Sequence, residues 1–383
     1  MLAVVLRRLG LMVLVFAGLV VIAFLMTQVL PGDPARAAAG RNASPEQIAA
    51  VASQLGLDQP VWRQFLRYAG RLLHGDLGTS VVTHRPVLAD LGEVLPVSLE
   101  LVLAAMLLNL VIGVPLGVLA AYRRGRWADG LTRVVVLLGA AVPAFWLGLI
   151  LQLVLSDRLH WLPLSGRLTY GYRVDDLTGM VTFDALVTGR WATFGNALAH
   201  LVLPAVTLAA PFIAVVARTV RSSMISVLDA DFVQLARATG AGEWRVVVRH
   251  ALRNALGPII TIVGMQLGWM LGATVLVEST FNRGGIGAYT VNAVLQNDLY
   301  AVIGSVLAIG VVFIVANVVV DLLQPALDPR LRGGGRAVSG LSVGGRPDLA
   351  VGPAGVTDPS APDVEAGADN AAAAPVPVAG VQR

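Results

Sequence analysis

The chain has 383 residues, a formal net charge of +4, 56% hydrophobic residues and only 14% charged residues. A soluble domain carries about 25% charged residues, so the composition indicates an integral membrane protein. No cysteine is present, which excludes disulfides, thiolate catalysis and cysteine-ligated metals. All 28 basic residues are arginine. Without lysine the chain can build neither a Walker A loop nor a Schiff base, so any ATP that drives it must be bound by another subunit.

Six apolar segments are each long enough to cross a bilayer, which takes roughly 20 helical residues. They are about Leu9–Leu30, Val97–Tyr122, Leu131–Leu155, Leu198–Ala217, Ile259–Phe281 and Ala301–Leu323. The first exceeds the apolar core of about 7–15 residues in a secretory signal. We therefore expect it to stay uncleaved, although Ala37, Ala38 and Ala39 offer small residues for cleavage. The sequence predicts an all-α integral membrane protein with six transmembrane helices.

Arginine marks one side of this arrangement, because short cytoplasmic loops carry an excess of positive charge. The arginines near these loops are Arg7 and Arg8 before the first segment, Arg123, Arg124, Arg126 and Arg133 after the second, Arg218, Arg221, Arg237, Arg245, Arg249 and Arg253 after the fourth, and Arg330 and Arg332 after the sixth. All lie on the same side in a six-span arrangement. The longer loops between them mix arginine with acids. We therefore expect both termini to be cytoplasmic.

Three regions follow from the pattern. Residues 1–96 hold the first transmembrane helix and an extracellular segment with two short helices. One is Ser44–Gly56, where Ser44 and Gln47 form a capping box, and the other is Val61–Leu73. Residues 97–332 form a core of five transmembrane helices. Residues 333–383 have too few large apolar side chains to offset the entropy of ordering, so we expect a disordered cytoplasmic tail.

The most informative stretch is Asp229–Pro258, which lies between two apolar segments. Its first half places Phe232, Leu235, Ala236 and Thr239 at helical spacing, and Gly240 and Gly242 then allow a tight reversal. Its second half places Trp244, Val247, Val248, Ala251 and Ala255 on one face and Arg245, Arg249 and Arg253 on another. Two interpretations fit. The pair of helices either lies on anionic lipid or forms a rigid projection that docks on a cytosolic partner.

This stretch resembles the cytoplasmic "EAA" loop of bacterial ABC-importer permeases, which docks into the ATPase subunit. The fixed glycine of that loop falls on Gly240, whereas Gln234-Leu235-Ala236 stand in place of Glu-Ala-Ala, so the acidic residue is missing. The run His250–Ala255 resembles the dipeptide, oligopeptide and nickel permeases. Further matching pieces, in chain order, are Leu6–Leu9, Pro31–Pro34, Leu55–Asp58, His74–Gly78, Arg218, Arg221–Met224, Glu278–Phe281 and Asp328–Arg330. The likeness covers about residues 1–332.

The resemblance implies a type I ABC-importer permease in a bacterial cytoplasmic membrane. It would be the subunit that translocates di- or oligopeptides, with nickel chelates or glutathione as alternative substrates. It implies a second homologous permease, two ATP-binding subunits that hold ATP and magnesium, and an extracellular substrate-binding protein. Membrane lipid would surround the chain, and no nucleic acid is implied. Within a coupling loop at 222–258, the ATPase-coupling candidates are Asp231, Phe232, Leu235, Ala236, Arg237, Gly240 and Arg245.

Polar and small residues inside the spans give further candidates. Intramembrane polar groups usually face the protein interior or a water path, so Asn109, Gln266 and Trp269 are candidates for the substrate pathway. Gly264, Gly268 and Gly272 form a doubled GxxxG face, which indicates either close helix packing or a pore lined by backbone. Glu100 and Glu278 fall near predicted span ends, where we expect them to contact water.

Two other function classes fit less well. An intramembrane hydrolase needs a paired nucleophile and base, and no span holds a histidine at depth. A self-contained secondary transporter usually shows internal repeats, which this sequence lacks. The run Gly340–Gly344 matches the G-x-S-x-G pattern of hydrolases but lies in the predicted tail, without the strand and helix that the motif needs. No catalytic residue, cofactor or metal site is therefore expected in this chain.

Overall fold

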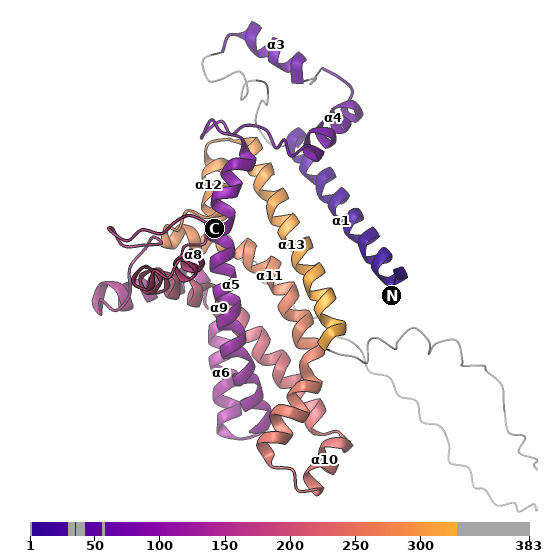
Figure 1. The fold of residues 1–383 in the computed structure, drawn as a ribbon, viewed down its shortest axis with the longest axis vertical. Helices are drawn as coiled ribbons and strands as arrows, with labels where there is room; N and C mark the ends of the chain where they lie inside the picture. Colours follow the sequence, from indigo (N-terminus) through magenta and orange to yellow (C-terminus); the bar gives the residue numbers. More distant parts are fainter. Residues whose placement is uncertain (1, 30–34, 36–42, 56–57, 328–383) are drawn as a thin grey trace, which may run out of the picture. The chain divides into compact units, whose positions relative to one another are not determined.

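The computed structural model describes residues 2–29, 35, 43–55 and 58–327, and its regular structure there is helical (Figure 1). The long helices are α1 (Leu2–Val29), α5 (Val87–Tyr122), α9 (Trp191–Leu228), α11 (Arg253–Phe281) and α13 (Leu299–Leu327). The shorter helices are α3 (Pro45–Leu55), α4 (Val61–Leu73), α6 (Trp127–Ala141), α7 (Ala144–Leu151), α8 (Val181–Val187), α10 (Asp231–Ala238) and α12 (Ile286–Leu295), with π-helical segments η1 (Gln152–Arg158) and η2 (Arg245–Leu252). Within these residues the only strand-like pairing is one bridge, Thr79 to Pro86. The predicted all-α class is confirmed.

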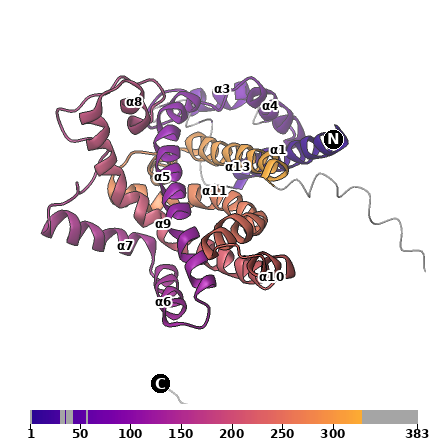
Figure 2. The ribbon, with the colours of Figure 1, turned by 60° about the horizontal axis from the view of Figure 1, so that its bottom comes forward.

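The centre of the bundle is made by α5, α9 and α11. Their buried side chains share one apolar cluster, which includes Leu101 and Met106 of α5, Leu208 of α9 and Met270 of α11. Around this centre, α13 packs on α11 and α1 packs on α13, whereas α6 and α7 pack on α9 (Figures 1 and 2). The bundle therefore has two ends that can be told apart, one carrying α10 and the other carrying α12 (Figure 1).

Helices α5 and α9 form the most extensive helix pair of the described residues. Glycine makes the close approach possible, because a Cβ on Gly117 of α5 would lie 2.6 Å from both the Ala217 carbonyl oxygen and the Val220 Cβ of α9. Small residues at such crossings let helix backbones approach in a membrane protein, where van der Waals packing drives association.

Five of the described helical runs are long and apolar enough to cross a membrane, or up to six if one bent pair counts as a single span. They confirm five of the six predicted spans. Two are much longer than predicted: α9 has 38 residues, and the helical run Arg245–Phe281 has 37 and continues through Pro258. Hydropathy misses these extensions because they carry arginines and polar residues on exposed faces.

The third predicted span, Leu131–Leu155, is helical but is not one continuous helix. The chain there forms α6 and then α7 followed by η1, with a bend of 98° between the two parts. Pro143 causes the break, because its ring disfavours helical backbone in the residue before it. Val142 accordingly has extended dihedral angles of φ −83° and ψ 126°.

The two short helices predicted before the second span are both present. At the start of α3, the Ser44 backbone N–H donates to Gln47 Oε1 (2.9 Å) and the Gln47 N–H donates to Ser44 Oγ (3.3 Å), which confirms the capping box. Helix α4 has the predicted bounds. Its Phe65 and Tyr68 rings pack on Phe24 of α1, with centroids 5.4 Å and 5.8 Å apart.

Some sequence predictions lie outside the described residues. They include the tail at 333–383 with its G-x-S-x-G run, the small residues at 37–39, and the motif Asp328–Arg330.

Candidate functional site

The predicted coupling loop lies at the end of the bundle opposite α12 (Figure 1). Helix α9 ends at Leu228, α10 covers Asp231–Ala238, and the chain then enters η2, which runs directly into α11. Two of the three central helices are therefore joined directly to the loop. Two residues separate the end of α9 from α10, and η2 passes into α11 without a break.

Gly240 makes the turn between α10 and η2. Its φ is +81°, a left-handed conformation that costs little only for glycine. The Gly240 N–H donates to the Arg237 carbonyl and the Ala241 N–H donates to the Ala236 carbonyl, both at 3.0 Å. This is the Schellman arrangement, which satisfies the last carbonyls of a helix. No atom lies within 4 Å of where a Cβ would stand, so the requirement for glycine is conformational.

One face of the loop packs on the span core. Val233 of α10 and Val246 and Ala251 of η2 are fully buried. Val247 and Ala251 belong to an apolar cluster with Val220 and Met224 of α9. The predicted apolar face of the second half is thus observed at Val247, Val248, Ala251 and Ala255. Trp244 departs from that prediction, because 79% of it is exposed.

The other face of the loop is exposed and partly apolar. Phe232 is 44% exposed, Leu235 is 65% exposed and Trp244 points away from the core. Asp231 is exposed at the first turn of α10, where a negative charge suits the helix dipole. Ala236 is half-buried, and Gly240 and Arg245 are exposed. Arg237 donates to Glu243 across the glycine turn (Nε to Oε1, 3.0 Å), so it is partly occupied within the loop. The structure thus places all seven coupling candidates on one compact projection.

Three ion pairs lie at or near the base of the projection, and the sequence analysis predicted none of them. Arg124 Nη1 donates to Asp229 Oδ2 at 3.2 Å, which joins the α5–α6 turn to the start of the loop. Asp129 of α6 is buried and accepts two hydrogen bonds from Arg221 of α9 and two, at 3.3 and 2.8 Å, from Arg133. The excess of arginine in these loops is visible in the sequence, but the pairing of Asp129 with Arg133 and Arg221 is not.

The predicted pathway residues fall into two environments. Asn109 of α5 and Gln266 of α11 are buried, and the Asn109 Nδ2 donates to the Gln266 Oε1 at 2.7 Å. Gln266 Nε2 also donates to the Phe212 carbonyl of α9 at 3.4 Å. Asn109 and Gln266 therefore tie the three central helices together. Trp269 is on α11 but 72% exposed, so the structure does not bring it together with the other two.

Two carboxylates expected to contact water are buried instead. Glu278 is fully buried and accepts hydrogen bonds from Ser98 Oγ and from the Gly287 N–H (2.8 Å) at the start of α12. Glu100 is 6% exposed and accepts a hydrogen bond from Arg283 Nη2 at 3.0 Å. Burial lowers the pKa of Arg283, and the adjacent Glu100 opposes that shift. The error arose because span ends predicted from hydropathy do not reveal that α8 and α12 cover them.

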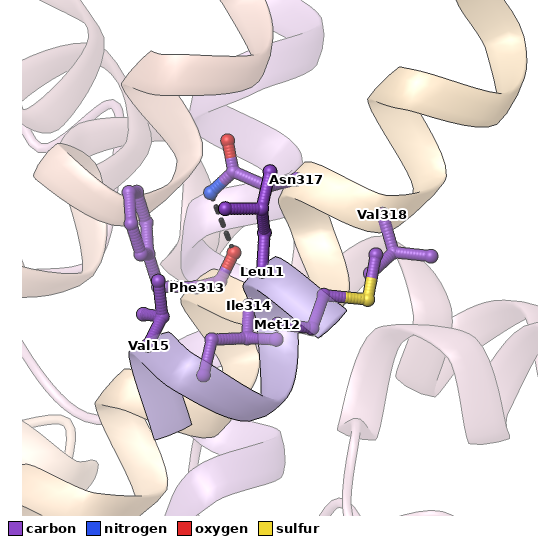
Figure 3. A pocket seen from close by; sticks show the side chains of 7 residues that line it. All are labelled: Leu11, Met12, Val15, Phe313, Ile314, Asn317 and Val318. Carbon is purple, nitrogen blue, oxygen red and sulfur yellow. Dashed lines mark hydrogen bonds between the residues drawn. The ribbon is translucent and has the colours of Figure 1, made fainter. Parts of the chain in front are cut away.

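A cavity of about 200 Å³ lies between α1 and α13 (Figure 3). It is lined by Leu11, Met12, Val15, Phe313, Ile314, Asn317 and Val318. Asn317 is the polar side chain in this lining, and its amide donates to the Phe313 carbonyl at 2.8 Å. The cavity is therefore mostly apolar. No cluster of three or more metal-ligating side chains occurs among the described residues.

A bundle of apolar helices with an exposed, partly apolar projection at one end is typical of a membrane transport subunit. Comparison with known families makes the class specific. Residues 113–333 match the family described as "Binding-protein-dependent transport system inner membrane component", and residues 1–102 match the N-terminal region of such membrane components. The chain belongs to this family and is a multi-pass inner-membrane permease component.

Curated relatives extend over most of the chain. The probable D,D-dipeptide transport system permease protein DdpB of Escherichia coli K12 is 45% identical over 85% of this chain and 96% of its own length. The dipeptide transport system permease protein DppB of the same strain is 39% identical over 87% and 99%. The glutathione transport system permease protein GsiC of Escherichia coli O6:H1 is 37% identical over 85% and 97%.

Proposed function

We propose that this chain translocates di- or oligopeptides as the permease subunit of an ATP-driven importer and docks on a separate ATP-binding subunit through residues 229–258. The observation that carries the proposal is the projection of Phe232, Leu235 and Trp244 at one end of the bundle, with its opposite face anchored on α9. Exposed apolar side chains on a rigid support are typical of the anchor residues of a protein interface.

The peptide substrate follows from the relatives. Two of those described above are dipeptide permeases. Glutathione is the second candidate, because a glutathione permease is 37% identical over 97% of its own length. Uptake of a labelled dipeptide, with unlabelled dipeptide or glutathione as competitor, separates the two substrates.

In this proposal the end that carries α10 is cytoplasmic and both termini lie on that side. Two ATP-binding subunits hold ATP and magnesium, since a chain without lysine cannot form the phosphate loop that binds them. A second permease completes the pathway, and an extracellular binding protein delivers the substrate at the other end. Closure of the ATP-binding subunits moves α10 and η2, and the continuous helices α9 and α11 carry that motion into the span core.

Co-purification tests the docking directly. We expect Phe232→Ala and Leu235→Ala each to weaken retention of the ATP-binding subunit, since truncation of an interface hot spot costs about 2 kcal/mol or more. Leu73→Ala is the matched control, because Leu73 is an equally apolar residue that is 82% exposed on a different helix. Unchanged retention in both loop variants would contradict the assignment of this loop.

Uptake tests the turn. Gly240→Val should abolish ATP-driven uptake while the protein still inserts, because a β-branched residue is strained at φ +81°. Gly171→Val is the control, since Gly171 has φ +97° and also has open space around it. It imposes a similar strain outside the loop. Normal uptake by the Gly240 variant would rule out a role for the turn geometry in coupling.

A further inference from the structure

A second cavity, of about 420 Å³, lies between α5, α6 and α9. Its lining consists of Ala120, Thr132, Arg133, Val136, Leu137, Ala217, Arg218 and Arg221. The volume falls within the range of about 300–1,000 Å³ that is usual for small-molecule sites. This lining includes three arginines and no acid, so the cavity has a strongly positive wall.

The positive charge is only partly neutralised. Asp129 does not line the cavity but pairs with both Arg221 and Arg133, so its negative charge offsets one of the three positive charges. Arg218 is exposed and has no acidic partner among the described residues. Three arginines and one aspartate leave a net charge of +2 at the cavity. Charge-assisted hydrogen bonds from arginine to phosphate oxygens are among the strongest polar contacts in proteins.

The lining changes character along the helices. On α6, Arg133 is followed one turn later by Val136 and Leu137, deeper in the span. On α9, which runs the other way, Ala217 stands deeper than Arg221. Helix α6 therefore presents its arginine nearer the end of the bundle that carries α10 and its apolar side chains nearer the middle, whereas α9 adds Arg218 and Arg221 to the positive wall. A ligand that fits this gradient has an anionic head and an apolar tail.

We propose that this cavity binds the phosphate group of an anionic phospholipid, with one acyl chain against Val136 and Leu137. The apolar half of the lining favours a lipid over a free anion, because inorganic phosphate would leave that surface uncovered. Basic pockets between transmembrane helices are suited to anionic head groups for the same reason. The proposal does not depend on the transported substrate or on docking of the ATP-binding subunit.

Native mass spectrometry of the delipidated full-length chain tests this site. The protein is titrated separately with phosphatidylglycerol and phosphatidylcholine of identical acyl chains, and with inorganic phosphate. We expect tighter binding of phosphatidylglycerol, and Arg218→Gln should weaken it about fivefold, the effect of one arginine at a membrane surface. Arg126→Gln is the matched control, because Arg126 is exposed at the start of α6 and does not line the cavity.

A second variant acts through shape instead of charge. Val136→Trp fills the apolar part of the cavity and should also reduce phosphatidylglycerol binding while leaving all three arginines in place. Equal binding of the two lipids to the unaltered protein would overturn the proposal, as would an equal loss in the Arg126 and Arg218 variants. If inorganic phosphate bound as tightly as phosphatidylglycerol and displaced it, the site would be assigned to a soluble anion. That result would also overturn the proposal of a lipid site.

Discussion

Asp129 and Arg221 join α6 to α9 across 92 positions of sequence, through hydrogen bonds of 2.8 Å (Nε to Oδ1) and 3.0 Å (Nη2 to Oδ2). The carboxylate is almost entirely buried, and the arginine side chain is 23% exposed. Arg221 lies two turns before the end of α9. This pair therefore fixes α6 against the helix that leads into the coupling loop.

Asp129→Asn should destabilise the protein by roughly 3 kcal/mol, because removal of one partner leaves the charge of Arg221 uncompensated in a mostly buried position. Thermal unfolding in detergent measures the change. Arg133→Gln is the control, since its side chain is 62% exposed and an exposed pair contributes only about 0.2–1 kcal/mol. Equal effects of the two substitutions would show that Arg221 is not the main partner of Asp129.

Two glycines of α11 test how closely that helix packs on α13. A Cβ on Gly268 would overlap the ring of Phe313, whereas a Cβ on Gly272 would meet nothing within 4 Å. Gly268→Ala should therefore destabilise the protein by about 1–3 kcal/mol through overpacking. Gly272→Ala should be neutral or slightly stabilising, because alanine is the better helix former. The melting temperatures of the two variants are measured in the same detergent. A lower melting temperature for Gly272→Ala than for Gly268→Ala would contradict the packing of α11 on α13.

The Asn109–Gln266 hydrogen bond allows a test of the predicted pathway role. Interhelical hydrogen bonds in membranes contribute about 0.6 kcal/mol on average, so replacement of both side chains by leucine should change stability little. If the pair also serves the pathway, uptake should fall in the double variant while melting stays near that of the unaltered protein. Full uptake with unchanged melting would leave these residues with a packing role alone.

Glu278 should be required to hold the N-terminus of α12 in place. It accepts hydrogen bonds from Ser98 Oγ and from the Gly287 and Ala288 N–H groups. Glu278→Ala leaves these buried donors without an acceptor, which costs about 1–3 kcal/mol for such a group. Hydrogen exchange of the α12 amides should accelerate. Glu93→Ala is the control, because Glu93 is exposed and pairs with Arg85 at the surface. No change in exchange would mean that α12 is held by its apolar contacts.

Several elements could be predicted from local sequence alone. Apolar length located five of the spans, and the spacing of Ser44 and Gln47 correctly identified the start of α3. The double-glycine break gave the turn at Gly240, because the requirement for positive φ is a local property. Local rules failed where the outcome depended on distant partners. The acids Glu100 and Glu278 looked solvated at predicted span ends, yet both are buried by partners far along the chain.

The length of α9 has a mechanical consequence. At about 1.5 Å per residue, its 38 residues form a rod of roughly 57 Å, nearly twice the apolar thickness of a bilayer, about 30 Å. The same rod starts beside α8 and ends two residues before α10. A tilt of only ~5° about one end would sweep the other end by ~5 Å, given that length. In the mechanism proposed above, a small rotation imposed on α9 at the loop would therefore displace its opposite end by several ångströms.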